Sequence, residues 1–133
     1  MQIVIFACVH NAGRSQMAAA FFNKYAHPTK AKAISAGTQP ALQVHPEVKT
    51  VMSEIEISLN EAHPKLLTAE LAKDAEYLIT MGCKENCPYI PGLKILDWPF
   101  QDPKGQSLQN VRETRDKIKT QVLNFLAQNL WLK

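Results

Sequence analysis

Strand-like and helix-like segments alternate regularly along the chain, and this alternation constrains the fold more than any other feature. Residues 2–7 form an apolar run typical of a buried strand, and shorter runs of the same kind occupy 32–35, 77–81 and 93–96. Met17, Phe21 and Tyr25 recur every four residues, as on one face of a helix. Such patterns, together with turn-forming residues at their ends, predict helices over 15–27, 46–55, 68–72 and 107–130.

This alternation predicts an α/β fold, a parallel sheet joined by right-handed crossovers with helices on both faces. The 133 residues match one ordinary domain, so we predict a single domain over 1–133. In such sheets ligands bind beyond the carboxyl ends of the strands. Cys8, Cys83 and Asp102 each follow a predicted strand, and we expect them to share that edge.

The composition excludes several classes of function. The residues are 46% hydrophobic, which is enough to bury a real core, and the net charge of +3 is dispersed along the chain, which gives little reason to expect nucleic acid as a partner. No apolar run approaches the roughly 18 residues of a membrane span. We expect a cytoplasmic monomer without a targeting signal, whose thiols are kept reduced.

The segment CVHNAGRS, at positions 8–15, lies between the first predicted strand and the first predicted helix. A loop in this position can direct successive backbone N–H groups at one point, where the helix dipole adds positive charge. Ala12 and Gly13 let the backbone close around an ion, and Arg14 offers a planar fork to two oxygens of an oxyanion. The predicted anion-binding residues are Val9, His10, Asn11, Ala12, Gly13 and Arg14.

Cys8 lies at the base of this predicted anion site. The positive field favours its thiolate, and the hydroxyl of Ser15 can donate a hydrogen bond to it, so the site is typical of a sulfur nucleophile directed at an oxyanion. The alternative is an inert buried cysteine before an ordinary helix, but the strand–loop–helix context favours function. We expect the His10 side chain to point outward and Asn11 to brace the loop.

Cys83 and Cys87 form a second cysteine motif, with a glycine before it and a proline after it. Residues four apart on a helical turn bring their Cβ atoms to about 5–6 Å, whereas a disulfide needs about 4 Å. A disulfide between them therefore requires a rearrangement of the loop. The alternatives are two inert thiols or half of a zinc site with Cys8 or His10, and because no second Cys or His pair occurs, we predict no metal.

The cysteine loop resembles the signature loop of the low-molecular-weight protein tyrosine phosphatase superfamily, and it is most similar to the thioredoxin-coupled arsenate reductases of that fold. The similarity covers nearly the whole chain. It implies a four-stranded sheet in the order 2-1-3-4. The other matching motifs are Ile34-Ser35-Ala36-Gly37, Met81-Gly82-Cys83, Cys87-Pro88, Asp97-Trp98 and Asp102-Pro103.

The resemblance implies arsenate reduction in arsenic detoxification, with no cofactor. Cys8 would attack arsenate, Asp102 would protonate the departing oxygen, and Cys83 and then Cys87 would resolve the adduct before thioredoxin reduces the disulfide. Arg14 and Ser15 would complete the catalytic set. The resemblance also implies a weak phosphatase side activity, and phosphate or sulfate would compete for the site.

This sequence departs from the family at three positions. Lys104 stands where the phosphatases commonly carry tyrosine, and Gly13 stands where many relatives carry a second loop cysteine, so Cys83 must reach Cys8. Some relatives bind potassium through an acidic residue on the first helix, where this chain has Ala19, while Asn11 and Ser35 remain. Three alternatives stay open: a phosphatase, a glutathione- or mycothiol-dependent transferase, and a non-catalytic oxyanion sensor.

Overall fold

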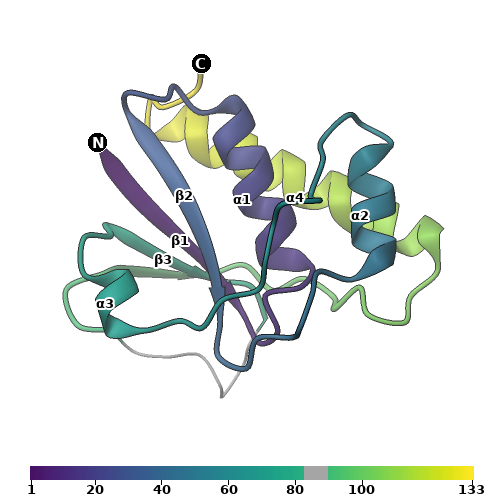
Figure 1. The fold of residues 1–133 in the computed structure, drawn as a ribbon. Coiled ribbons are helices and arrows are strands. Elements are labelled where there is room, and N and C mark those ends of the chain that lie inside the picture. The colour runs from purple at the N-terminus through teal and green to yellow at the C-terminus, as the bar shows by residue number, and fades with distance from the viewer. Residues whose placement is uncertain (83–89) are drawn as a thin grey trace.

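The computed structural model describes residues 1–82 and 90–133, and shows one α/β domain (Figure 1). The predicted elements are all present, with ends shifted by a few residues. Helix α1 begins at Arg14, one residue before the predicted start, so its first N–H groups face the cysteine loop. In chain order the elements are β1 (Gln2–Cys8), α1 (Arg14–Tyr25), β2 (Ala31–Gly37), α2 (Pro46–Ser53), α3 (Ala69–Ala72), β3 (Tyr77–Thr80), β4 (Lys94–Asp97) and α4 (Leu108–Gln128).

The four strands form one parallel sheet in the order β2-β1-β3-β4, which confirms the predicted order. Strand β1 lies inside the sheet and pairs with β2 from Gln2 opposite Ala31 to Cys8 opposite Gly37. It is the most apolar strand, and residues 4–8 are buried. Strand β4 is the opposite case, an edge strand with all four residues exposed.

The two faces of the sheet carry unequal cores, because successive side chains of a strand point to opposite sides. Val4 and Phe6 face the larger core, which α1, α2 and α4 complete. Ile5 and Ala7 face a small core with Leu78 of β3, and the single turn of α3 covers it. The expectation of helices on both faces is therefore confirmed, but the three longer helices share one face (Figure 1).

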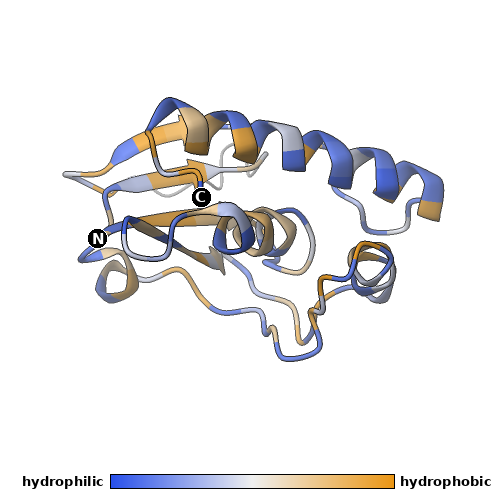
Figure 2. Cartoon of the chain, turned by 90° about the horizontal axis from the view of Figure 1, so that it is seen from above, coloured by the Kyte–Doolittle hydropathy of each residue, from blue (hydrophilic) through white to orange (hydrophobic). Residues whose placement is uncertain are grey.

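Helix α4 shows why the larger core forms where it does. Its apolar residues gather on the side that faces the sheet, and polar residues cover its outer side (Figure 2). Val111, Ile118 and Val122 are fully buried, and Phe125 packs edge-to-face on Trp98 with ring centroids 5.6 Å apart. This long amphipathic helix and the buried strand β1 hold the sheet edge that carries the site.

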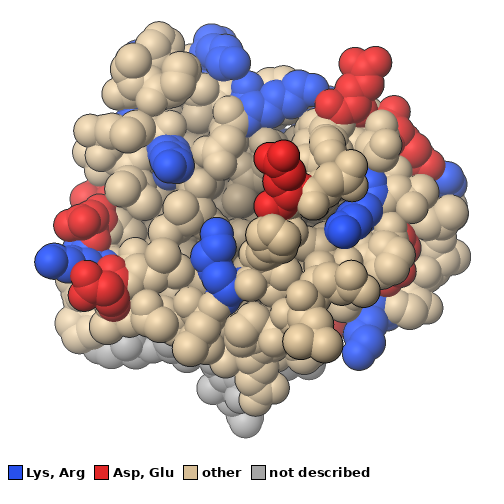
Figure 3. Space-filling view, in the orientation of Figure 1, with Lys and Arg blue, Asp and Glu red and all other residues tan. Residues whose placement is uncertain are grey.

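Among residues 1–82 and 90–133, no helix is long and apolar enough to cross a membrane. On the face shown in Figure 3, acidic and basic side chains are interspersed.

Candidate active site

The loop after β1 forms a cup of backbone amides, which we call the anion cradle and define as residues 9–14 with Cys8 at its base. The carbonyl oxygens of the loop point outward and accept hydrogen bonds from the segment 38–45. Because the carbonyls point outward, the amides point inward, and no N–H of residues 10–14 has an acceptor in the described part of the chain. The outward bonds are Thr38 N to Cys8 O, Gln39 N to Val9 O, Ala41 N to His10 O and His45 N to Ala12 O, at 2.8–3.3 Å.

The backbone conformation of the cradle matches an anion-binding nest. Asn11 has φ of 49°, in the left-handed region that lets consecutive N–H groups converge. Asparagine tolerates this region better than most residues, which agrees with its predicted role as a loop brace. The N-terminus of α1 opens directly into the same cup. A tetrahedral oxyanion placed there would meet several N–H donors and the positive end of a helix.

Cys8 is 2% exposed, and its sulfur lies 2.9 Å from Ser15 Oγ. A third residue, Asn11, donates from its Nδ2 to Ser15 Oγ at 2.7 Å. Because the Ser15 oxygen accepts from Asn11, its single proton is free to donate to the sulfur. A hydroxyl placed in this way can hold the sulfur of a nucleophile by a hydrogen bond.

Arg14 is buried and held by two carbonyl groups from distant segments. Its Nη1 donates to Met81 O at 2.7 Å and to Phe100 O at 3.2 Å. Gly82, with φ of 89°, lies so close that a Cβ there would be 2.7 Å from the same nitrogen. A side chain at Gly82 would thus displace the guanidinium, which explains why a glycine is needed between β3 and the next segment.

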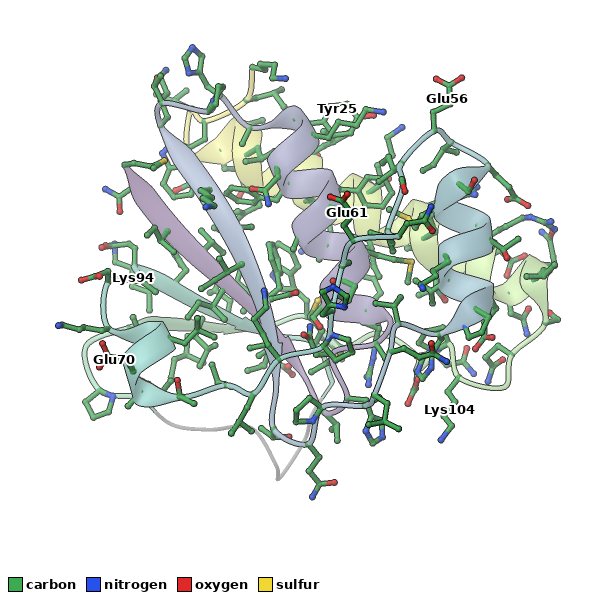
Figure 4. All side chains as sticks on the ribbon, in the orientation of Figure 1. Tyr25, Glu56, Glu61, Glu70, Lys94 and Lys104 are labelled. Carbon is green, nitrogen blue, oxygen red and sulfur yellow. The ribbon has the colours of Figure 1, made fainter. Side chains whose placement is uncertain are left out.

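Asp102 lies in the loop 98–105, which follows β4 and reaches over the mouth of the cradle. Its Oδ2 is 3.8 Å from Arg14 Nη2, and its Oδ1 accepts from the backbone N–H of Lys104 at 3.0 Å. The side chain is 44% exposed. A half-exposed carboxyl beside the cradle can reach both solvent and a bound anion, as a proton donor must. Lys104 itself extends away from the body of the molecule (Figure 4).

Gly13 explains how the loop 98–105 comes so near the cradle. A Cβ on Gly13 would lie 2.6 Å from Pro103 Cγ and 3.6 Å from the His45 ring. Pro103 therefore packs in the space that a side chain at 13 would fill. Burial lowers the pKa of His45, although the nearby carboxylates of Glu47 and Asp102 oppose this shift.

The structure thus brings together the predicted residues Cys8, Arg14, Ser15 and Asp102 at one sheet edge. His10 contributes its backbone to the cradle, and its ring bonds to Gln39 O outside it at 3.1 Å. The predicted thiols Cys83 and Cys87 lie outside the described residues. Elsewhere in the chain, no three His, Cys, Asp or Glu side chains are grouped so that they could hold a metal.

Several groups at this site could not be predicted from the sequence. The carbonyl oxygens of Met81 and Phe100 orient Arg14, but every residue has a carbonyl, so no residue type marks them. Gln16 follows the motif directly and is buried against Asn11, and only its position beside the motif is a signal for it. His45 lies far along the chain and reaches the cradle through its backbone N–H.

Comparison with known proteins assigns this fold and cradle to a family. The low molecular weight phosphotyrosine protein phosphatase family matches residues 3–131, and the chain belongs to that family. This confirms the resemblance that the motifs predict.

Named relatives of the chain include arsenate reductases. A Halobacterium salinarum protein with the provisional name of arsenate reductase is 35% identical over 127 residues, or 92% of this chain and 89% of that protein. The glutaredoxin arsenate reductase of a Synechocystis species is 32% identical over 131 residues, which cover 96% of this chain and 98% of that protein. The structure of the Corynebacterium glutamicum thioredoxin-dependent arsenate reductase superposes with a TM-score of 0.81 and 36% identity. That match covers 96% of this chain but only 61% of the other.

Proposed function

We propose that this protein is an arsenate reductase of the low molecular weight phosphatase family. The observation that carries the proposal is a buried thiol at the base of an anion cradle, with a hydroxyl donor 2.9 Å from its sulfur. The cradle alone fits phosphate as well as arsenate. Relatives that match nearly the whole chain and bear the name arsenate reductase favour arsenate.

In the first step the Cys8 thiolate attacks arsenic, and an As–O bond breaks. Arg14 and the backbone N–H groups of the cradle hold the remaining oxygens, where charge increases during the attack. Asp102 donates a proton to the departing oxygen, which leaves as water. The product of this step is a covalent adduct between the Cys8 sulfur and arsenic, still at the pentavalent level.

In the second step two electrons reach arsenic through a second thiol. Cys83 attacks the Cys8 sulfur, the S–As bond breaks, and its electron pair stays with arsenic, which leaves as arsenite. Cys87 then attacks Cys83, releasing the Cys8 thiolate and forming a Cys83–Cys87 disulfide. Gly13 carries no thiol, so Cys83 is the proposed partner of Cys8.

A dithiol protein completes the cycle by reducing the disulfide and becoming oxidised itself. We assign this role to thioredoxin, because two internal thiols make an external small thiol unnecessary. The Corynebacterium relative is thioredoxin-dependent, whereas the name of the Synechocystis relative specifies glutaredoxin. In this proposal the protein acts as a cytoplasmic monomer in arsenic detoxification, with phosphate and sulfate as competing anions.

The second candidate is a phosphatase, which needs only Cys8, Arg14 and Asp102. The family name and the geometry of these three residues favour it. Lys104 argues against an aromatic substrate, because it stands where the phosphatases commonly carry the tyrosine that forms a wall of the site. A glutathione- or mycothiol-dependent transferase is a further alternative, in which an external thiol replaces Cys83.

The proposal is tested by arsenate-dependent NADPH consumption with thioredoxin and thioredoxin reductase, repeated with glutaredoxin and glutathione, and with mycothiol. A Cys83→Ser variant is the matched control. It should stop arsenate reduction and leave phosphate-ester cleavage in place, because only reduction needs a second thiol. Phosphate-ester turnover without arsenate reduction in the unaltered protein would support the phosphatase instead.

A further inference from the structure

Gln16, in the first turn of α1, has a carboxamide nitrogen that faces three oxygens. Its Nε2 lies 3.0 Å from Asn11 O, 3.2 Å from Asn11 Oδ1 and 3.2 Å from His63 O. Two of these are backbone carbonyls, which can only accept, so the nitrogen and not the oxygen of the amide faces them. The amide has two N–H groups for three acceptors, so the two Asn11 oxygens share one of them. Gln16 is 5% exposed. Its bond to His63 O links the start of α1 to a segment 47 residues away in the sequence.

These bonds orient the Asn11 carboxamide. Asn11 Oδ1 accepts from Gln16 Nε2 and also from the backbone N–H of Lys65 at 2.9 Å. With Oδ1 held by donors, Asn11 Nδ2 must face Ser15 Oγ, which leaves the Ser15 proton free to donate to Cys8. The direction of every hydrogen bond up to the sulfur thus depends on which way Asn11 points.

Potassium is implied at this place by some members of the family, but the residues here do not fit it. A potassium ion needs a shell of oxygens. Ala19 supplies none where relatives have an acidic residue, and Asn11 Oδ1 is already occupied by two N–H donors. The cavity beside Gln16 offers the hydroxyl of Ser35, but it is also lined by Lys32 and Lys65, with Glu61 over α1 as its one carboxylate (Figure 4).

We propose that Gln16 is the positioning residue that directs the Asn11–Ser15 hydrogen bonds at Cys8, and that this protein does so without a monovalent cation. The inference rests on the proposed role of Cys8 as the nucleophile. It is tested on the Cys8 thiol alone, without arsenate, so its failure is distinguishable from a failure of the reductase proposal.

The experiment measures the rate at which iodoacetamide alkylates Cys8 between pH 5 and pH 10. The background is Cys83→Ser/Cys87→Ser, in which Cys8 is the only thiol. A Gln16→Met variant keeps the length of the side chain but has no donor. We expect its rate to fall about tenfold near pH 7 and to converge with the background rate near pH 10, where the thiolate forms without help. Gln109→Met, on the exposed side of α4, is the matched control and should keep the background profile.

The pH profile separates positioning from loss of structure, because unfolding would expose Cys8 and change its rate at every pH. The other charged or titratable groups at the mouth stay the same in all variants: His10, Arg14, His45, Asp102 and Lys104. A Gln16→Met profile identical to the background would overturn the proposal.

The cation is tested at constant ionic strength in potassium, sodium and tetramethylammonium chloride, the last being too large for such a site. With Gln16 present, the three salts should give equal rates, and a saturable acceleration by potassium would contradict the proposal. A Gln16→Glu variant would place a carboxylate among the oxygens of Asn11 and His63. It should react slowly in tetramethylammonium and faster in potassium, and an unchanged fast rate without potassium would also overturn the proposal.

Discussion

The cradle and the loop 98–105 face each other across the site, and they are built very differently. In the cradle, Asn11 and Arg14 are buried, as is Ser15 directly after it, and each of the three makes at least one side-chain hydrogen bond. In the loop 98–105, Asp102 is 44% exposed, and its Oδ1 accepts a hydrogen bond from the backbone N–H of Lys104, two residues away.

The difference shows which half of the site is rigid by itself. The backbone of the cradle is fixed by bonds to the segment 38–45 and to α1. The loop 98–105 adds one bond to a cradle side chain, from Arg14 to Phe100 O at 3.2 Å. The loop 98–105 is anchored in the larger core by Trp98. Beyond that point the cradle places it, through the Arg14–Asp102 pair and through Pro103 packed against Gly13. Changes in the cradle should therefore abolish the chemistry, whereas changes in the loop should slow it.

The largest effect is expected for Cys8→Ser. Arsenate reduction and any phosphate-ester cleavage should fall by at least about 10⁴-fold, because a hydroxyl is a far poorer nucleophile in this cradle. Phosphate should still bind, since Arg14 and the backbone donors remain, and calorimetry can measure this binding beside the turnover assays. Appreciable turnover in either assay would remove Cys8 from the mechanism.

Asp102→Asn is expected to have the next largest effect. The amide cannot supply a proton to the departing oxygen, so turnover should fall roughly 100-fold. Alkylation of Cys8 should stay within about twofold, because the Asn11–Ser15 bonds at the sulfur do not involve Asp102. Equal losses in turnover and in thiol reactivity would mean that the loop 98–105 also shapes the cradle.

Gly13→Ala tests the contact between the two halves. The new Cβ would lie 2.6 Å from Pro103 Cγ and push the loop 98–105 outward, so turnover should fall about tenfold while phosphate binding changes little. Pro103→Ala removes the clashing ring atoms, and the double variant should recover part of the loss. Strictly additive losses in the two single variants would show that the contact does not place Asp102.

The smallest effect is expected on the pH dependence of stability, through His45, which lies beside the Gly13–Pro103 contact. Burial lowers the pKa of His45 from 6.5 in the folded protein, so the unfolded chain takes up the proton first as the pH falls. The free energy of unfolding should therefore decline below about pH 6.5, and less so in His45→Gln. Urea unfolding at pH 7.5 and pH 5.5 measures the difference, and an unchanged decline in His45→Gln would assign it to other groups.

Local signals were enough to predict the elements and the sheet edge at which Cys8 and Asp102 meet. An apolar strand, small loop residues and a helical stripe each leave a pattern in neighbouring residues, and strand order follows from the family. The family resemblance also predicts Asp102 as the acid, and the structure places its carboxylate 3.8 Å from Arg14.

Contacts made through backbone atoms could not be predicted in this way. Met81 O and His63 O orient Arg14 and Gln16 from positions 67 and 47 residues away, and neither depends on which side chain those positions carry. The unequal size of the two cores could not be predicted either. The pattern of a buried strand shows that both of its faces are covered, but it does not show how many helices cover each face. The need for a glycine at position 13 becomes clear only from the structure, in which Pro103 packs against it.

The central claim is that Cys8 receives arsenate and is resolved by Cys83, and one measurement tests it most directly. Cys87→Ser protein is treated with one equivalent of arsenate, and its linkages are mapped by mass spectrometry of peptides. One arsenite should be released per enzyme, with a Cys8–Cys83 disulfide left behind, because no thiol remains to move it outward. Arsenite release without a Cys8–Cys83 linkage would contradict the account and favour attack by an external thiol.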